Sequence, residues 1–90
     1  LMIRRDVIYQ GRVQGVGFRW TTNRLARDFA VSGTVENRSD GSVYMVVEGK
    51  ESEIDQFMEA IANRMSTNIK STSIQEGIAS KEFQEFRVNY

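Results

Sequence analysis

The chain begins with a strand-like alternation of apolar and polar residues. Within residues 3–13, one face of an extended chain carries Val7, Tyr9 and Val13. Alternation with a period of two is typical of a half-buried strand, so we expect a strand over this segment. The glycine-rich segment 11–17 ends the alternation.

Two later segments repeat apolar residues at spacings of three and four. In residues 18–30 these positions are Phe18, Thr22, Leu25, Ala26, Phe29 and Ala30. In residues 52–65 they are Ile54, Phe57, Met58, Ile61, Ala62 and Met65. Each spacing predicts an amphipathic helix. The run from Ser52 to Asp55 resembles a capping box that would open the second helix.

A hairpin is expected between the two helices. Thr34–Arg38 and Ser42–Glu48 are strand-like, and Ser39, Asp40 and Gly41 separate them. An Asp-Gly pair between two such runs is a strong hairpin signal, because both residues tolerate a positive φ. We therefore predict two antiparallel strands joined by a tight turn.

The rest of the chain indicates an α+β fold. Residues 66–80 are polar, but Ile69, Ile74 and Ile78 can support one irregular strand, and residues 86–90 alternate as a short closing strand. The order strand, helix, strand, strand, helix, strand predicts a ferredoxin-like βαββαβ two-layer sandwich. We expect residues 1–90 to form a single domain with a mainly antiparallel sheet, two helices on one face and a short extra C-terminal strand.

Composition narrows the function. The 90 residues include 12 basic and 12 acidic side chains, and their zero net charge argues against an unspecific binder of nucleic acid or anionic membranes. Histidine and cysteine are absent, which removes the usual zinc ligands and the commonest general base. We expect no metal and no cofactor. No apolar run is long enough to span a membrane, so we expect a soluble, cytoplasmic protein. We also expect it to be a monomer.

The segment Gly11–Arg19 is the strongest candidate for chemistry. Its glycines require a tight turn that exposes backbone N–H groups, and a helix begins at once behind it. A helix N-terminus attracts anions through its unpaired N–H groups and its dipole, and Arg19 adds a full charge. A purely structural turn is the alternative interpretation.

The same segment resembles the signature of the acylphosphatase family. Residues 33–43, which read Gly-Thr-Val-Glu-Asn-Arg-Ser-Asp-Gly-Ser-Val, resemble the second motif of that family, and residues 86–90 fit its ending. The resemblance implies hydrolysis of the carboxyl–phosphate anhydride of a small acyl phosphate, without a metal or a covalent intermediate. Inorganic phosphate would be a product or an inhibitor. Thr34 stands where the family commonly has an aromatic residue.

The resemblance also implies a set of site residues. Arg19 and Asn37 would be catalytic, with Asn37 positioning the attacking water. The substrate-binding residues would be Gln14, Gly15, Val16, Gly17, Phe18 and Arg19. An arginine fork can hold two phosphoryl oxygens, and an asparagine amide can orient a water.

Other interpretations stay open from the sequence. A noncatalytic phosphate-sensing or interaction module would use the same loop. An RNA-binding domain shares the βαββαβ order, but Tyr9 and Tyr44 are the only aromatic residues in the two strands concerned. Trp20, next to Arg19, either packs against the protein or contacts the acyl group. Arg4 and Arg5 are expected to be a solvated terminus.

Overall fold

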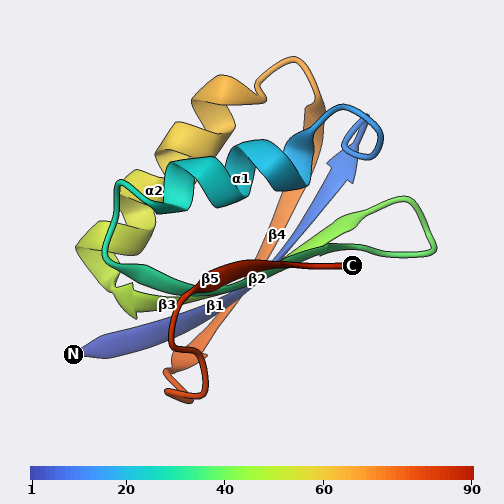
Figure 1. Cartoon of the computed structure of the whole chain (residues 1–90). Helices are drawn as coiled ribbons and strands as arrows, with labels where there is room; N and C mark the ends of the chain where they lie inside the picture. Colours follow the sequence, from blue (N-terminus) through green and yellow to red (C-terminus); the bar gives the residue numbers. More distant parts are fainter.

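Five strands and two helices follow one another in the predicted order (Figure 1). The computed structural model describes all 90 residues. The elements are β1 (Met2–Gly11), α1 (Phe18–Ala26), β2 (Val31–Asn37), β3 (Val43–Lys50), α2 (Glu51–Arg64), β4 (Ile69–Ile78) and β5 (Phe86–Asn89).

The strands form one mixed sheet in the order β4-β1-β3-β2-β5. β1 runs antiparallel to both of its neighbours, β3 and β4, and β2 is antiparallel to β3. β5 adds to the free edge of β2 and is parallel to it. The predicted ferredoxin-like sandwich with an extra C-terminal strand is therefore confirmed.

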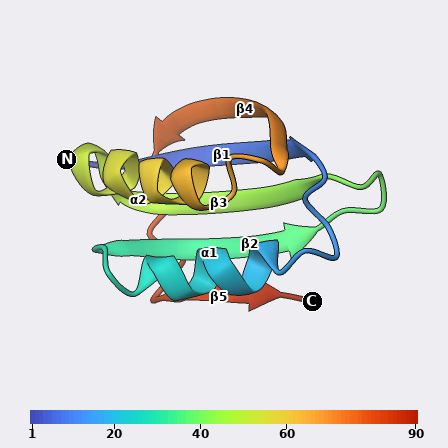
Figure 2. The ribbon, with the colours of Figure 1, turned by 90° about the horizontal axis from the view of Figure 1, so that it is seen from above.

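Both helices cover the same face of the sheet, and the other face carries none (Figure 1, Figure 2). Seen from the helix side, α1 lies over β2 and β5, and α2 lies over β1 and β3 (Figure 2). The core fills the space between the layers, and its 13 buried residues are Val7, Tyr9, Val13, Phe18, Ala26, Val35, Val43, Met45, Val47, Ile54, Phe57, Ile61 and Met65. The predicted apolar faces of β1 and of both helices meet in this core.

The helix ends differ from the prediction for local reasons. α1 stops at Ala26, and the N–H groups of Arg27, Asp28 and Phe29 bond to carbonyls three residues earlier, which tightens the last turn. The predicted capping box is wrong, because no side chain caps α2. Asp55 pairs instead with Arg5 at 2.7 Å between Nη1 and Oδ1.

The predicted hairpin is confirmed, but its turn differs. Only Gly41 has a positive φ, at 92°, and its N–H donates to the Arg38 carbonyl over 3.1 Å. The Asp40 carboxylate accepts a hydrogen bond from the N–H of Ser42 over 2.9 Å. Asp40 therefore stabilises the turn through its side chain and not through an unusual backbone conformation.

The two N-terminal arginines are not the solvated pair that the sequence suggested. Nε of Arg5 lies 2.8 Å from a Glu76 carboxylate oxygen on β4, and this guanidinium also pairs with Asp55 on α2. Arg4 pairs with Asp6 and with Glu82 at 2.8 and 3.0 Å. Each guanidinium therefore connects segments far apart in the sequence.

Neither helix is long and apolar enough to cross a membrane.

Candidate active site

The loop between β1 and α1 is shaped by two left-handed glycines. Gly15 has φ 74° and Gly17 has φ 78°, values that residues with a side chain rarely adopt. A Cβ built on either glycine meets nothing within 4 Å. Glycine is thus required here by the backbone conformation and not by crowding.

This conformation leaves a row of unused hydrogen-bond donors. None of the backbone N–H groups of residues 14–17 donates to another group of the protein. The free N–H groups continue into the start of α1, because the first helical hydrogen bond runs from the Thr21 N–H to the Gly17 carbonyl over 2.9 Å. No acidic residue stands in the first turn of this helix. Free amides at a helix N-terminus without a competing carboxylate are suited to bind an anion.

Gln14 fixes the loop to the β2–β3 hairpin. Its Nε2 donates to the carbonyl of Arg38 over 2.7 Å and to the carbonyl of Ser42 over 2.9 Å. The N–H groups of its side chain are therefore already used, and its backbone N–H is the donor that is left to contact an anion. Val16 packs against the core through its side chain. The sequence had no signal for the partners of Gln14, because they are backbone atoms of a distant turn.

A pocket of about 150 Å³ brings most of the predicted site residues together. Its lining consists of Val13, Gly15, Gly17, Phe18, Arg19, Trp20, Asn37 and Tyr90. Arg19 enters from the first turn of α1, and Asn37 enters from the last residue of β2. The crossover that places α1 over β2 thus puts a cation and an amide from two motifs beside the same loop.

Asn37 has an unused acceptor. Its Oδ1 is buried and receives no hydrogen bond from the protein. Buried carbonyl oxygens normally have a partner, so a donor from a ligand or a water is the expected one. Half a turn about the last side-chain torsion exchanges the two amide groups, so either can face the pocket.

Arg19 is held by an aromatic ring and not by a carboxylate. Its guanidinium carbon lies 4.9 Å from the centroid of the Tyr90 ring, and it takes part in none of the ion pairs. Stacking uses the face of the guanidinium and leaves its N–H edges free. Sequence reasoning did not assign Tyr90 to the site, although the match at residues 86–90 pointed to this strand.

Nearby ionisable groups do not supply a base. Burial raises the pKa of Tyr9, which packs its ring 5.0 Å from that of Phe18 beneath the loop. Its phenol is therefore protonated at neutral pH. No group of three or more His, Cys, Asp or Glu side chains is arranged to hold a metal ion. The pocket can bind and orient, and it has no strong proton acceptor.

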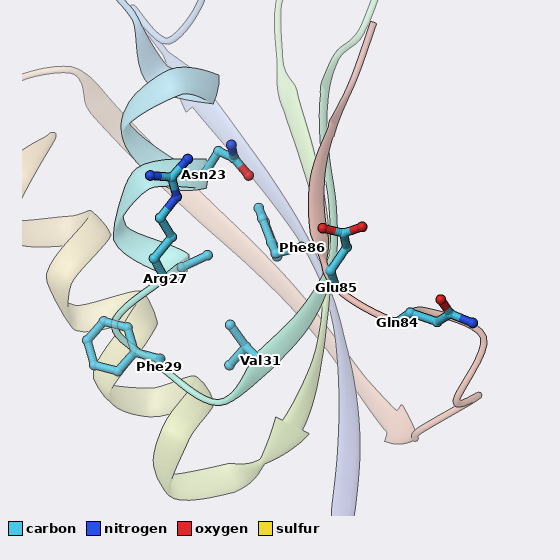
Figure 3. Close-up of a pocket in the computed structure, with 8 residues that line it drawn as sticks. Asn23, Arg27, Phe29, Val31, Gln84, Glu85 and Phe86 are labelled. Atoms are coloured by element: carbon cyan, nitrogen blue, oxygen red, sulfur yellow. The ribbon is translucent and has the colours of Figure 1, made fainter.

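A larger hollow lies at the other end of α1 (Figure 3). Its volume is about 380 Å³, and its lining includes Asn23 and Arg27 from the helix and Phe86 from β5. It contains none of the predicted site residues. Its size alone does not make it the site, because the free amides, Arg19 and Asn37 are all elsewhere.

Comparison with known proteins agrees with the motifs. The acylphosphatase family model matches residues 5–88. The acylphosphatase of Bacillus velezensis is 37% identical over 90 residues, with 99% of this chain and 100% of that protein covered. The acylphosphatase of Lactobacillus gasseri is 38% identical over 82 residues, covering 89% of this chain and 90% of that protein.

The fold agrees as well. The crystal structure of acylphosphatase from Bacillus subtilis superimposes with a TM-score of 0.87 at 31% identity, over 98% of this chain and 99% of the other. The chain therefore belongs to the acylphosphatase family, and it is a hydrolase of acyl phosphates.

Proposed function

We propose that the β1–α1 loop and Arg19 bind the phosphoryl group of a small acyl phosphate, and that Asn37 directs the attacking water. The observation that carries this proposal is a pocket lined by Gly15 and Gly17 of the loop with the free amides, by an arginine without an acidic partner, and by an asparagine whose buried amide oxygen has no donor. These groups come from both sequence motifs.

The loop supplies the electrostatic part of the reaction. Phosphoryl transfer spreads negative charge over three equatorial oxygens and needs little covalent assistance. The amides of residues 14–17 and the guanidinium edge of Arg19 are donors for those oxygens. Because the loop is fixed by two left-handed glycines and by Gln14, these donors need little reorganisation when charge develops.

Asn37 orients the attacking water. Its amide accepts a hydrogen bond from a water and holds the water oxygen in line with the bond between phosphorus and the acyl oxygen. The new bond forms between the water oxygen and phosphorus, and the electron pair of the broken bond leaves on the carboxylate. The water protons pass to the phosphate product and to solvent. A carboxylate is a good leaving group, so no general acid is required.

The proposal includes a monomeric, cytoplasmic enzyme that inorganic phosphate inhibits by competing for the loop. A monomer is sufficient, because one chain provides every residue of the pocket.

The test is hydrolysis of acetyl phosphate in the presence of a metal chelator, followed through release of inorganic phosphate. The expected result is turnover that the chelator does not change. Turnover that is lost with the chelator and restored by a divalent cation would contradict the mechanism. Phosphate binding without any turnover would favour a phosphate-sensing module.

A further inference from the structure

The exposed aromatic side chains gather at one place. The chain has one tryptophan, three tyrosines and five phenylalanines, and only Trp20 and Tyr90 are largely exposed, at 64% and 96%. Both line the pocket that contains Arg19 and Asn37. Single exposed apolar residues are ordinary, whereas two large rings on the rim of a polar pocket indicate a ligand with an apolar part.

The rim and the interior of the pocket differ in character. Asn37 is half-buried, with its Oδ1 fully covered, so it lies on the inner side. Trp20 follows Arg19 directly in the first turn of α1, and its indole is on the solvent side. The pocket therefore runs from a buried amide, past the phosphate-binding loop, to an aromatic rim.

The in-line geometry of the proposed reaction relates this rim to the substrate. If the water is held by Asn37, the leaving carboxylate must lie on the opposite side of the phosphorus. That side is the exposed one, where the acyl group of the substrate would meet Trp20 and Tyr90.

We infer that Trp20 is a specificity-determining residue that stacks on the acyl group, with Tyr90 as a second wall, and that it favours acyl phosphates with an aromatic or extended apolar acyl group. The inference rests on the proposed function. Tyr90 already contacts the guanidinium of Arg19 at 4.9 Å, whereas the indole of Trp20 makes no aromatic or cation–π contact within the protein.

The kinetic test compares two substrates, benzoyl phosphate and acetyl phosphate, in the wild type and in Trp20→Ala. Loss of one stacking partner is expected to lower kcat/KM for benzoyl phosphate about tenfold, mainly through KM, and for acetyl phosphate less than about twofold. Trp20→Phe keeps a ring and is expected to retain most of the preference.

The matched control is Ile78→Ala. Ile78 is another large apolar residue, 88% exposed, but it lies on β4 at the opposite edge of the sheet from β5. We expect this variant to leave both substrates unchanged. An equal change for both substrates in Trp20→Ala would overturn the role of Trp20 while the proposed function stands. Failure of the wild type to hydrolyse either substrate would overturn the proposed function and the acyl site together.

The binding test uses Trp20 as its own reporter, because it is the single tryptophan. Phenacylphosphonate, in which a methylene replaces the bridging oxygen, carries the same aryl group and is not hydrolysed. Its binding is expected to change the tryptophan emission, whereas inorganic phosphate and methylphosphonate leave the emission nearly unchanged. Calorimetric saturation by phenacylphosphonate without any emission change would overturn the inference.

Discussion

At the scale of single residues, we expect Gln14 to influence the site without contact between its side chain and the substrate. Its side chain joins the β1–α1 loop to the hairpin that follows Asn37, through two carbonyl acceptors. Positions that hold a catalytic group within a fraction of an ångström affect rate more than stability.

Gln14→Leu keeps the size of the side chain and removes both hydrogen bonds. We expect turnover of acetyl phosphate to fall about tenfold, because the loop and Asn37 are no longer held together. The free energy of unfolding should fall by only about 1–2 kcal/mol. Steady-state kinetics and urea unfolding measure the two effects.

The control is Gln10→Leu. Gln10 makes one exposed hydrogen bond, from the Ser71 hydroxyl over 3.2 Å, away from the pocket. Gln10→Leu should change neither the turnover of acetyl phosphate nor the free energy of unfolding appreciably. A Gln14 variant with unchanged kinetics would show that the connection to the hairpin has no part in catalysis.

The sequence was sufficient to propose candidate site residues that carry charge or turn the backbone, but it did not indicate the residues whose contacts depend on distant partners. Arg19, Asn37 and the glycines were identified from motifs whose members are near one another in the chain. Tyr90 could not be assigned, because its contact with Arg19 joins the residue after β5 to α1. The partners of Gln14 are backbone carbonyls, which carry no sequence signature.

At the scale of elements, Glu48 at the end of β3 fixes the connection between β4 and β5. Its carboxylate is 2% exposed and accepts hydrogen bonds from the Ser80 N–H, the Ser80 hydroxyl and the Lys81 N–H at 2.7, 2.7 and 2.8 Å. The connection leads into β5, which carries Phe86 into contact with the core. Glu48 therefore helps to place the strand that ends at the pocket.

Low pH is expected to weaken the hydrogen bonds between Glu48 and the β4–β5 connection. Burial alone would raise the pKa of Glu48, but the hydrogen bonds from Ser80 and Lys81 outweigh it, so the pKa lies below its usual range. The hydrogen bond from Arg4 likewise lowers the pKa of Asp6. Carboxylates with a lowered pKa stabilise the fold above their unfolded pKa of about 4, and this stability is lost as the pH falls through the folded pKa.

Urea unfolding at a series of pH values from 7 down to 3 measures this effect, with Glu48→Gln as the comparison. The variant should be less stable at pH 7 by about 2–3 kcal/mol, because it loses charge-assisted hydrogen bonds in a buried site. Its stability should also decline less between pH 5 and 3. Parallel pH profiles for the two proteins would contradict the assignment to Glu48.

Element types were predictable from periodicity, whereas element ends were not. Both helices and the strands β1, β2, β3 and β5 follow from apolar spacing. β4 was hard to recognise, since nine of its ten residues, 70–78, are exposed and it forms one edge of the sheet. The capping box failed because α2 begins at Glu51 with Lys50 at its N-cap, so Ser52 lies inside the helix and Asp55 pairs with Arg5. A long-range pair of this kind is not visible in the sequence.

At the scale of the whole molecule, binding and stability are linked. A ligand that binds only the folded state stabilises it by an amount that grows with its concentration relative to Kd. The pocket is lined by the β1–α1 loop, by α1, by the last residue of β2 and by Tyr90 after β5, so it forms only in the folded chain. Phosphate should therefore raise the melting temperature.

At a phosphate concentration of one hundred times Kd, the expected stabilisation is about 2.7 kcal/mol, or a rise of about 15 °C in Tm for a domain of this size. Differential scanning calorimetry measures it. Arg19→Ala should abolish most of the rise, and a chelator should leave the Tm unchanged. An equal rise for Arg19→Ala would place phosphate somewhere else on the protein.

The architecture as a whole was predictable, because the order of elements and the single apolar face of each helix allow few arrangements. The ion pairs that connect the layers were not predictable from the sequence. Arg5 joins β1 to β4 and α2, although in the sequence it is simply one of two adjacent basic residues near the start of the chain.

The central claim is that one element binds the phosphoryl group and another orients the water. The most direct test is Asn37→Ala, with turnover of acetyl phosphate and the Kd of inorganic phosphate measured on the same preparation. The control is Asn23→Ala, because Asn23 lies on α1 in the larger hollow and does not line the candidate site. We predict that kcat falls about 100-fold or more, since only the orienting group is lost. The phosphate Kd should change by less than about twofold, since the loop and Arg19 are intact. Unchanged kcat, or loss of phosphate binding equal to the loss of turnover, would contradict this division of roles.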